Sequence, residues 1–225
     1  MQMVLDLISK CGCVITYEDP RYVYEGDLRD ASQEHRHLDR FPSGGAPKVS
    51  IPVGGSIELT VPNGAQLREQ TTNDLLQQLV QSWSDSNQGG GHFEVLRQDG
   101  VFHVVPIEVR DQNGNWEAAQ SILADPVSVP TQSRDDWQTY KAIGQAIGAA
   151  ANVKVVTILN GGLILGGSPF RNQYVFGAQG EPADDVLMNA FKLMGKTRTW
   201  LLTYEPTTHV YFLNIDDVSG LTDVH

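Results

Sequence analysis

Four stretches of the chain share one pattern of apolar residues, which recur at positions i, i+1, i+4, i+5 and i+8. The stretches begin at Met3, Leu75, Ala142 and Val186. This spacing puts the apolar side chains of each stretch on one face of an α-helix. Runs rich in β-branched and aromatic residues follow at 14–17, 93–96, 153–158 and 200–204. The pattern therefore predicts four short helices, each packed on a sheet that contains the strand after it.

The four helix–strand units alternate between two kinds. In the second and fourth units, a turn at 98–100 or 205–208 leads directly into another strand, which predicts a β-hairpin. In the first and third units the strand runs into a longer connection. Further strands are expected at 126–129, before the third helix, and at 173–176, before the fourth. This order predicts an α+β fold of two tandem β-α-β-β-α-β domains with short helices packed on sheets.

The domain boundaries follow from the same order. We place the first domain at 1–117, the second at 126–217 and a tail at 218–225. The apolar stripes start 72 residues apart in the first domain (3 to 75) and 44 residues apart in the second (142 to 186). The difference of 28 residues falls largely in an insertion at about 31–62. Within it, a strand pair is predicted at 49–53 and 57–61.

The first domain has no counterpart of the strand at 126–129, because the chain begins directly with the first amphipathic helix. We therefore expect that the natural protein has residues before Met1 that supply this strand. An export signal would need a basic segment followed by an apolar one, and no such signal is present in this chain.

Two segments carry a resemblance to a known domain family. Residues 183–195, with the strands at 199–204 and 209–215, resemble the second helix and closing hairpin of the short N-terminal (STN) domain of secretins and TonB-type proteins. Residues 3–10 and 12–19 resemble its opening helix and strand. The resemblance implies two STN-like domains in tandem, the first without its opening strand. It also implies a binding and signalling module of the bacterial cell envelope or periplasm, without catalytic residues.

Composition narrows the class of partner. The chain has 16 Lys and Arg residues against 27 Asp and Glu residues, a formal net charge of −11 and a pI near 4.8. This charge repels phosphate backbones and anionic lipid surfaces. The longest apolar segment, around 161–167, is broken by glycines and is much shorter than the roughly 20 residues of a membrane-spanning helix. We therefore expect neither a nucleic-acid partner nor membrane insertion.

Potential metal ligands are densest in the insertion, where Glu34, His35, His37 and Asp39 lie close together. The two histidines face the same side only if this segment is extended, and a zinc site needs a third ligand that is rigidly held. Polar residues in such an insertion are normally solvated. A surface loop is therefore the favoured interpretation, and no metal or cofactor is expected. The alternative is a metal-dependent enzyme with its site at these residues.

Two glycine-containing segments superficially resemble phosphate-binding loops. Gly195-Lys196-Thr197 lacks the glycine that a P-loop has five positions earlier, where Ala190 stands instead. The segment also ends a helix, and a helix C-terminus repels phosphate. The stretch at 161–167 has no basic residue or hydroxyl placed for a phosphate, so we interpret it as a tight connection.

The cysteines and histidines give no catalytic set. Cys11 and Cys13 are too few for a disulfide framework, and a bridge between cysteines one residue apart is strained, so we interpret both as small buried residues. His92, His103 and His209 lie in or beside the predicted hairpins without an evident nucleophilic partner. We interpret each as a buried or edge histidine and assign no catalytic residue.

These observations predict a non-enzymatic protein of the cell envelope. Its two domains would recognise a protein or peptide through sheet edges or through the groove between the domains. A structural subunit of a larger assembly is a further possibility, which differs only in having a fixed partner. The sequence leaves the partner's identity and the oligomeric state open.

Overall fold

The computed structural model of the chain describes residues 7–8, 13–31, 50–53, 69–86, 90–160 and 172–218. These residues form the α+β structure that the sequence predicts, with helices packed on mixed sheets. The described helices are α2 (Glu69–Ser86), α3 (Asp136–Ala150) and α4 (Ala183–Met194), with a short 3-10 turn at Glu25–Asp27. Leu7 and Ile8 are helical as well.

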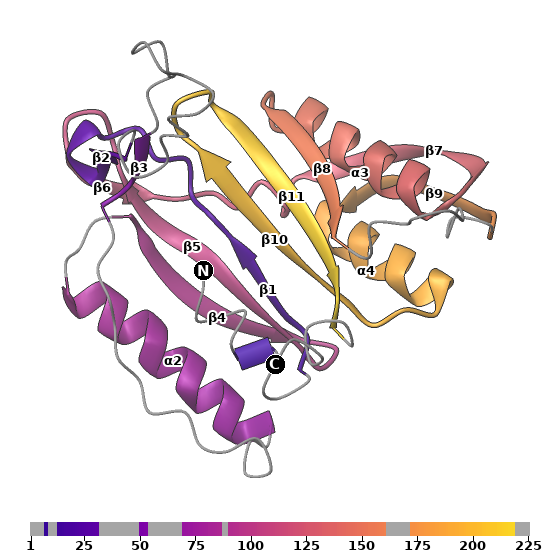
Figure 1. The fold of residues 1–225 in the computed structure, drawn as a ribbon, viewed down its shortest axis with the longest axis horizontal. Helices are drawn as coiled ribbons and strands as arrows, with labels where there is room; N and C mark the ends of the chain where they lie inside the picture. The colour runs from indigo at the N-terminus through magenta and orange to yellow at the C-terminus, as the bar shows by residue number, and fades with distance from the viewer. Residues whose placement is uncertain are drawn as a thin grey trace, which may run out of the picture.

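A seven-stranded sheet forms the centre of the structure (Figure 1). Its strands, in spatial order, are β4 (His92–Gln98), β5 (Val101–Arg110), β1 (Ile15–Glu18), β10 (Arg198–Glu205), β11 (Val210–Asp217) and β8 (Lys154–Asn160), and β6 (Trp116–Ala118) pairs with the far end of β5. Two small sheets accompany it, β2 (Leu28–Asp30) with β3 (Ser50–Pro52), and β7 (Pro126–Arg134) with β9 (Tyr174–Pro182).

The central sheet contains the same three-stranded arrangement twice. In the first unit, the hairpin β4–β5 lies beside β1, which runs parallel to β5. In the second unit, the hairpin β10–β11 lies beside β8, which runs parallel to β11. The units join where β1 pairs in parallel with β10, so every strand of the second unit runs opposite to its counterpart in the first. The two units are therefore related by a half-turn about an axis that lies in the sheet perpendicular to the strands, together with a shift along this axis.

This half-turn also exchanges the faces of the sheet. At the junction Tyr17 pairs with Leu201, and Glu18 pairs with Leu202. Paired residues point to the same face. Tyr17 and Leu201 pack with the core of the first unit, whereas Leu202 belongs to the core of the second. The helices of the two units consequently cover opposite faces of one sheet, and Figure 1 shows α2 near one end of it and α3 and α4 near the other.

Each unit has its own hydrophobic core. The first core is built mainly from Leu7, Ile8, Ile15, Leu75, Leu76, Val80, Phe93, Phe102 and Val104. The second is larger and includes Val127, Val129, Tyr140, Ile143, Ile147, Val186, Leu187, Phe191, Trp200, Leu202, Leu213 and Ile215. In α4 every residue of the apolar stripe is buried. In α3 the buried face is shifted, because Tyr140 is buried together with Ile143 and Ile147 while Ala150 is exposed.

Local sequence signals set the limits of the helices. Asp135 caps α3 by accepting a hydrogen bond from the backbone N–H of Gln138, whose side chain accepts one from the Asp135 N–H in return. Gly195 ends α4 in the left-handed conformation, with φ of 62°, which a residue without a Cβ adopts at no steric cost.

The structure confirms the predicted helices at α2, α3 and α4 and corrects two other expectations. Trp83, at the end of the apolar stripe of α2, is only half-buried at the edge of the first core. The hairpins of the two predicted domains lie in one continuous sheet, whereas β7 and β9 form a separate two-stranded sheet. Strand β3, within the predicted strand at 49–53, pairs with β2, and its predicted partner at 57–61 lies outside the described residues. The boundaries at 1–117 and 126–217 remain a prediction.

The state of Cys13 differs from the one that the sequence analysis predicts. It is disulfide-bonded and half-buried beside the first core, and it is therefore not a buried thiol. Its Sγ also lies 3.6 Å from the hydroxyl of Thr72 on α2. Cys11 is the only other cysteine of the chain, and it lies outside the described residues.

Truncation of Phe191 to alanine should lower the free energy of unfolding by roughly 3–5 kcal/mol, because the ring fills the second core between Tyr140 and Trp200. Leu193→Ala, two positions along the same helix, is the matched control. Its side chain is 47% exposed, so it should cost less than about 0.5 kcal/mol. Urea unfolding of both variants measures the difference, and equal losses would show that the apolar stripe does not face the core.

Candidate functional site

The first unit has an open sheet face opposite α2. Side chains alternate along a strand, and Phe102 and Val104 point into the first core, so His103, Val105 and Ile107 point to the other face. Leu96 of β4 pairs with His103 and points the same way. Leu96 is 47% exposed and Ile107 is 39% exposed. This face, which we call the open face, therefore presents large apolar side chains to solvent.

The connecting segment (residues 119–125) crosses the open face between the two units. Its Ser121 hydroxyl and Ile122 N–H donate hydrogen bonds to the Glu18 carboxylate of the first unit. Its Leu123 is buried in the second core, and the Leu123 carbonyl accepts a hydrogen bond from the N–H of Asp184 at the start of α4. The segment is thus fixed to both units.

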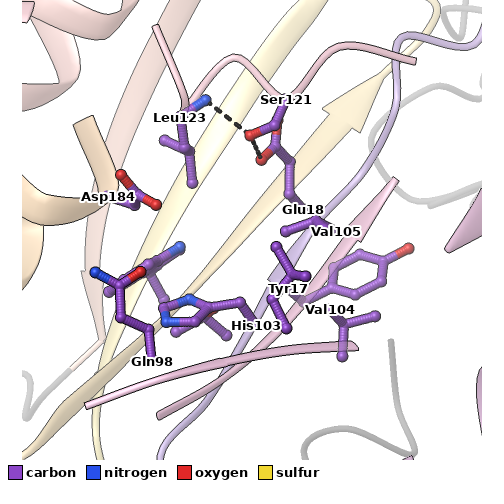
Figure 2. A pocket seen from close by; sticks show the side chains of 12 residues that line it. Tyr17, Glu18, Gln98, His103, Val104, Val105, Ser121, Leu123 and Asp184 are labelled. Carbon is purple, nitrogen blue, oxygen red and sulfur yellow. Dashed lines mark hydrogen bonds between the residues drawn. The ribbon is translucent and has the colours of Figure 1, made fainter. Parts of the chain in front are cut away.

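Two adjoining cavities lie between the open face and α4. The smaller, of about 40 Å³, extends from Glu18 on β1 to Leu123 in the connecting segment, and Figure 2 shows the side chains around it. The larger, of about 120 Å³, lies between the β4–β5 turn and the first half of α4. Gln98, His103 and Asp184 line both. These three residues come from both units of the sheet and form the centre of the candidate site.

Glu18 is the most buried carboxylate of the site, with an exposed fraction of 2%. Ser121 Oγ lies 2.6 Å from one of its oxygens, and Ile122 N lies 2.7 Å from the other. Burial raises the pKa of Glu18 to about 7, although both hydrogen bonds favour the ionised form, and the negative charge of Asp184 adds to the rise. Glu18 therefore changes its protonation state near neutral pH.

His103 lies on the floor of both cavities. Its Nδ1 is 2.8 Å from the hydroxyl of Thr16, and its ring packs at a tilt against Trp200 with centroids 5.6 Å apart. Burial lowers the pKa of His103, while Asp184 and Asp185 act in the opposite direction. The imidazole is consequently neutral at pH 7. Its Nε2 makes no hydrogen bond with any residue that the structure describes.

The rim of the larger cavity is formed by contacts between the two units. The side-chain amide of Gln98 donates to Asp185 over 3.1 Å, and the ammonium of Lys192 donates to Asp99 over 3.0 Å. Both contacts join the β4–β5 turn to α4. Burial raises the pKa of Asp184, which lies in the first turn of α4. The site thus gathers carboxylates and amides around an uncharged imidazole.

A second polar cluster fixes the junction on the other side of β1. The carboxylate of Asp19 accepts hydrogen bonds from the hydroxyls of Tyr17 (2.7 Å) and Tyr22 (3.0 Å) and from the N–H of Tyr204 (2.9 Å). The Asp19 N–H donates to the carbonyl of Leu202. Burial raises the pKa of Asp19 despite these bonds. All donors are used within the fold, so this cluster is structural.

Glu34, His35, His37 and Asp39 lie outside the described residues, so the metal-site alternative there remains a prediction. In the part of the chain that is described, no three His, Cys, Asp or Glu side chains gather in a way that could hold a metal ion. Sequence reasoning missed Glu18, Asp184 and the cavities, because these residues come together only through tertiary pairing.

The three histidines of the hairpins have separate environments. His92 lies 2.8 Å from a carboxylate oxygen of Glu108, and His209 lies 2.8 Å from the hydroxyl of Tyr204. Only His103 borders the cavities, and its burial agrees with the sequence-based interpretation.

Comparison with known proteins yields no match to a protein family, to a curated protein or to a solved structure. Among the described residues, no helix has the length and apolar character that spanning a membrane requires.

Replacement of Glu18 by glutamine should remove a loss in the free energy of unfolding that the wild-type protein undergoes as the pH rises. The folded state keeps the Glu18 proton up to about pH 7, whereas the unfolded state releases it near 4.5, so rising pH favours unfolding within this window. At about 1.4 kcal/mol for each pKa unit, the loss approaches ~3 kcal/mol and is complete above pH 7. The wild-type free energy of unfolding minus that of the variant should fall by this amount between pH 4.5 and 7.

Urea unfolding at several pH values measures this difference. Subtraction of the variant removes the contributions of groups that do not interact with Glu18, whereas those of Asp19 and Asp184 are coupled to its charge. A difference that stays constant from pH 4.5 to 7.5 would show that Glu18 titrates at its ordinary value in the folded protein.

Proposed function

We propose that this protein is a non-catalytic binding module of the bacterial cell envelope, which holds an extended segment of a partner protein along β4 and over the open face. The observation that carries the proposal is the open face itself. Leu96 and Ile107 are exposed there because the helices of the second unit cover the opposite end of the sheet, on that same side. An exposed apolar surface beside a sheet edge is typical of a protein-binding site.

The edge strand β4 supplies the backbone groups that such a segment needs. Within the described residues, β4 pairs on one side only, with β5. The Val95 carbonyl accepts a weak hydrogen bond from the Gln77 side chain over 3.5 Å, and no described strand pairs with the remaining outer backbone groups. Alternate side chains of that strand would fall on the open face, next to Leu96 and the cavities. This binding mode requires regular backbone geometry and few special side chains.

The other edge of the sheet is less suited to the same role. Strand β8 also pairs on one side only within the described residues, and its sequence is rich in β-branched residues. It lies at the far end from the open face and from both cavities. A segment on β8 would gain backbone pairing alone, whereas a segment on β4 would gain pairing, apolar contact and polar contacts together.

The envelope location is supported by two observations. The resemblance to the STN family implies the periplasm, and Cys13 is disulfide-bonded. Disulfides persist mainly in oxidising compartments such as the periplasm. Together they favour an exported protein.

The geometry of the candidate site favours binding over catalysis. The Ser121 hydroxyl donates to the Glu18 carboxylate and accepts from the Leu123 N–H, so both contacts hold the connecting segment in place. His103 Nδ1 is paired with Thr16 rather than with a carboxylate that would orient it as a general base. A metal-dependent enzyme that uses Glu34, His35, His37 and Asp39 remains the alternative, and no described residue adds support to it.

Selection of random-sequence peptides on the purified protein provides the test. The selected peptides should alternate apolar residues, and binding should slow amide hydrogen exchange in β4. Leu96→Glu should weaken their affinity at least about tenfold, since it places an unpaired charge against the apolar side chains of the peptide.

Val175→Glu is the matched control, because Val175 is the most exposed of the large apolar side chains and lies on β9, away from the open face. It should leave peptide affinity unchanged. The proposal is wrong if the selected peptides protect β8 or β9 instead of β4, or if both variants bind them as tightly as the wild type.

A further inference from the structure

The larger cavity beside α4 is lined mainly by hydrogen-bond acceptors. The side chains of Asp184 and Asp185 project from the first turn of α4, and Gln98 and Asn189 add amide groups. Gln98 uses its N–H to bind Asp185, so its carbonyl oxygen is left as an acceptor. The only cation that lines the cavity is Lys192, within the described residues, and its ammonium is bound to Asp99 at the rim.

His103 points to a ligand independently of these carboxylates. It is 8% exposed, and its Nε2 has no hydrogen-bond partner among the described residues, although its ring lines both cavities. A buried polar atom without a partner costs free energy unless something binds it. Figure 2 shows the His103 ring among the side chains that line the smaller cavity, which also include Gln98 and Asp184.

We infer that this cavity binds a primary ammonium group, and specifically the lysine side chain of a segment bound along β4. The assignment of the ammonium to a lysine of a bound segment rests on the proposed function. The assignment of an ammonium to the cavity rests on the cavity alone. An ammonium has three N–H donors and no acceptor, which matches a cavity lined by acceptors that still have unused lone pairs.

The matching acceptors come from three elements of the fold. When Nδ1–H of His103 donates to Thr16, Nε2 accepts from the ammonium. The Asp184 carboxylate accepts the second N–H and compensates the positive charge, and the Gln98 carbonyl accepts the third. The apolar stem of the lysine would lie along Leu96 and Met188, which line the smaller and the larger cavity respectively.

Other ligand classes fit less well. An anion would meet Asp184 and Asp185, and their charges would repel it. A metal ion needs a set of at least three close ligands, which the described residues do not provide. A guanidinium is a planar fork that prefers two oxygens of one carboxylate, whereas the acceptors here are single atoms on separate side chains. The compact ammonium is therefore favoured.

The test follows the His103 ring nitrogens by NMR during titration with n-butylammonium chloride at constant ionic strength. The Nε2 resonance should shift saturably with butylammonium and should not respond to 1-butanol, which has the same stem without the charge. Asp184→Asn should weaken binding at least tenfold, because the asparagine keeps the helix-start hydrogen bond from the Asp185 N–H but loses the charge.

Asp74→Asn, at an exposed position of α2, is the charge-matched control and should change nothing. The inference is overturned if butanol shifts the resonance equally, if the shift does not saturate, or if Asp184→Asn leaves the affinity unaltered. Unfolding curves of each variant confirm that the fold is retained.

A pair of β4-binding peptides separates this inference from the proposed function. One carries lysine at the position facing the cavity and the other carries norleucine, and the lysine peptide should bind about tenfold more tightly. If both bind equally and Leu96→Glu weakens both, the ammonium site is wrong and the proposed function holds. If butylammonium binds but no selected peptide protects β4, the proposed function is wrong and the ammonium site holds.

Discussion

The parallel pairing of β1 with β10 is the interaction on which the rest of the structure depends. It joins two units that are otherwise complete three-stranded arrangements, and its register decides which face each unit covers. A slip by one residue would turn Glu18 towards the first core and Tyr17 away from it, because side chains alternate along a strand. Polar contacts between β10 and both ends of β1 oppose such a slip. Asp19 is bonded to Tyr204, and the hydroxyl of Thr199 donates to the carbonyl of Ile15.

The half-turn between the units explains why an open face exists at all. If both units presented their helices to the same side, α3 and α4 would continue the layer begun by α2, and the other side would be left bare along the whole sheet. With the faces exchanged, each unit leaves one face uncovered beside the helices of its neighbour. The connecting segment must then cross this face to enter the second unit. Two hydrogen bonds to the buried carboxylate of Glu18 fix the segment there. Burial raises the pKa of this carboxyl group to about 7.

The apolar pattern of the sequence was enough to predict the helices, because helix periodicity is a local property. The limits of α4, from Ala183 to Met194, follow from its stripe and its terminal glycine. Pairing between distant strands has no such local signal. The run at 14–17 is apolar on both sides, as expected for a central strand buried on two faces, but nothing in it identifies β10 as a neighbour. Strand β2 was missed because Leu28–Asp30 is short and polar.

The candidate site could be predicted only in part for the same reason. His103 was interpreted as a buried or edge histidine of a hairpin, and it is buried, whereas Asp184 is an ordinary acidic residue in the first turn of a helix. Each residue has an adequate local explanation, so neither one indicates a shared cavity. The cavity arises because α4 of one unit begins beside the β4–β5 turn of the other, an arrangement set by the β1–β10 register. A functional surface built between repeated units in this way consists of residues whose local roles are ordinary, and its chemistry becomes visible only when the pairing of the units is known.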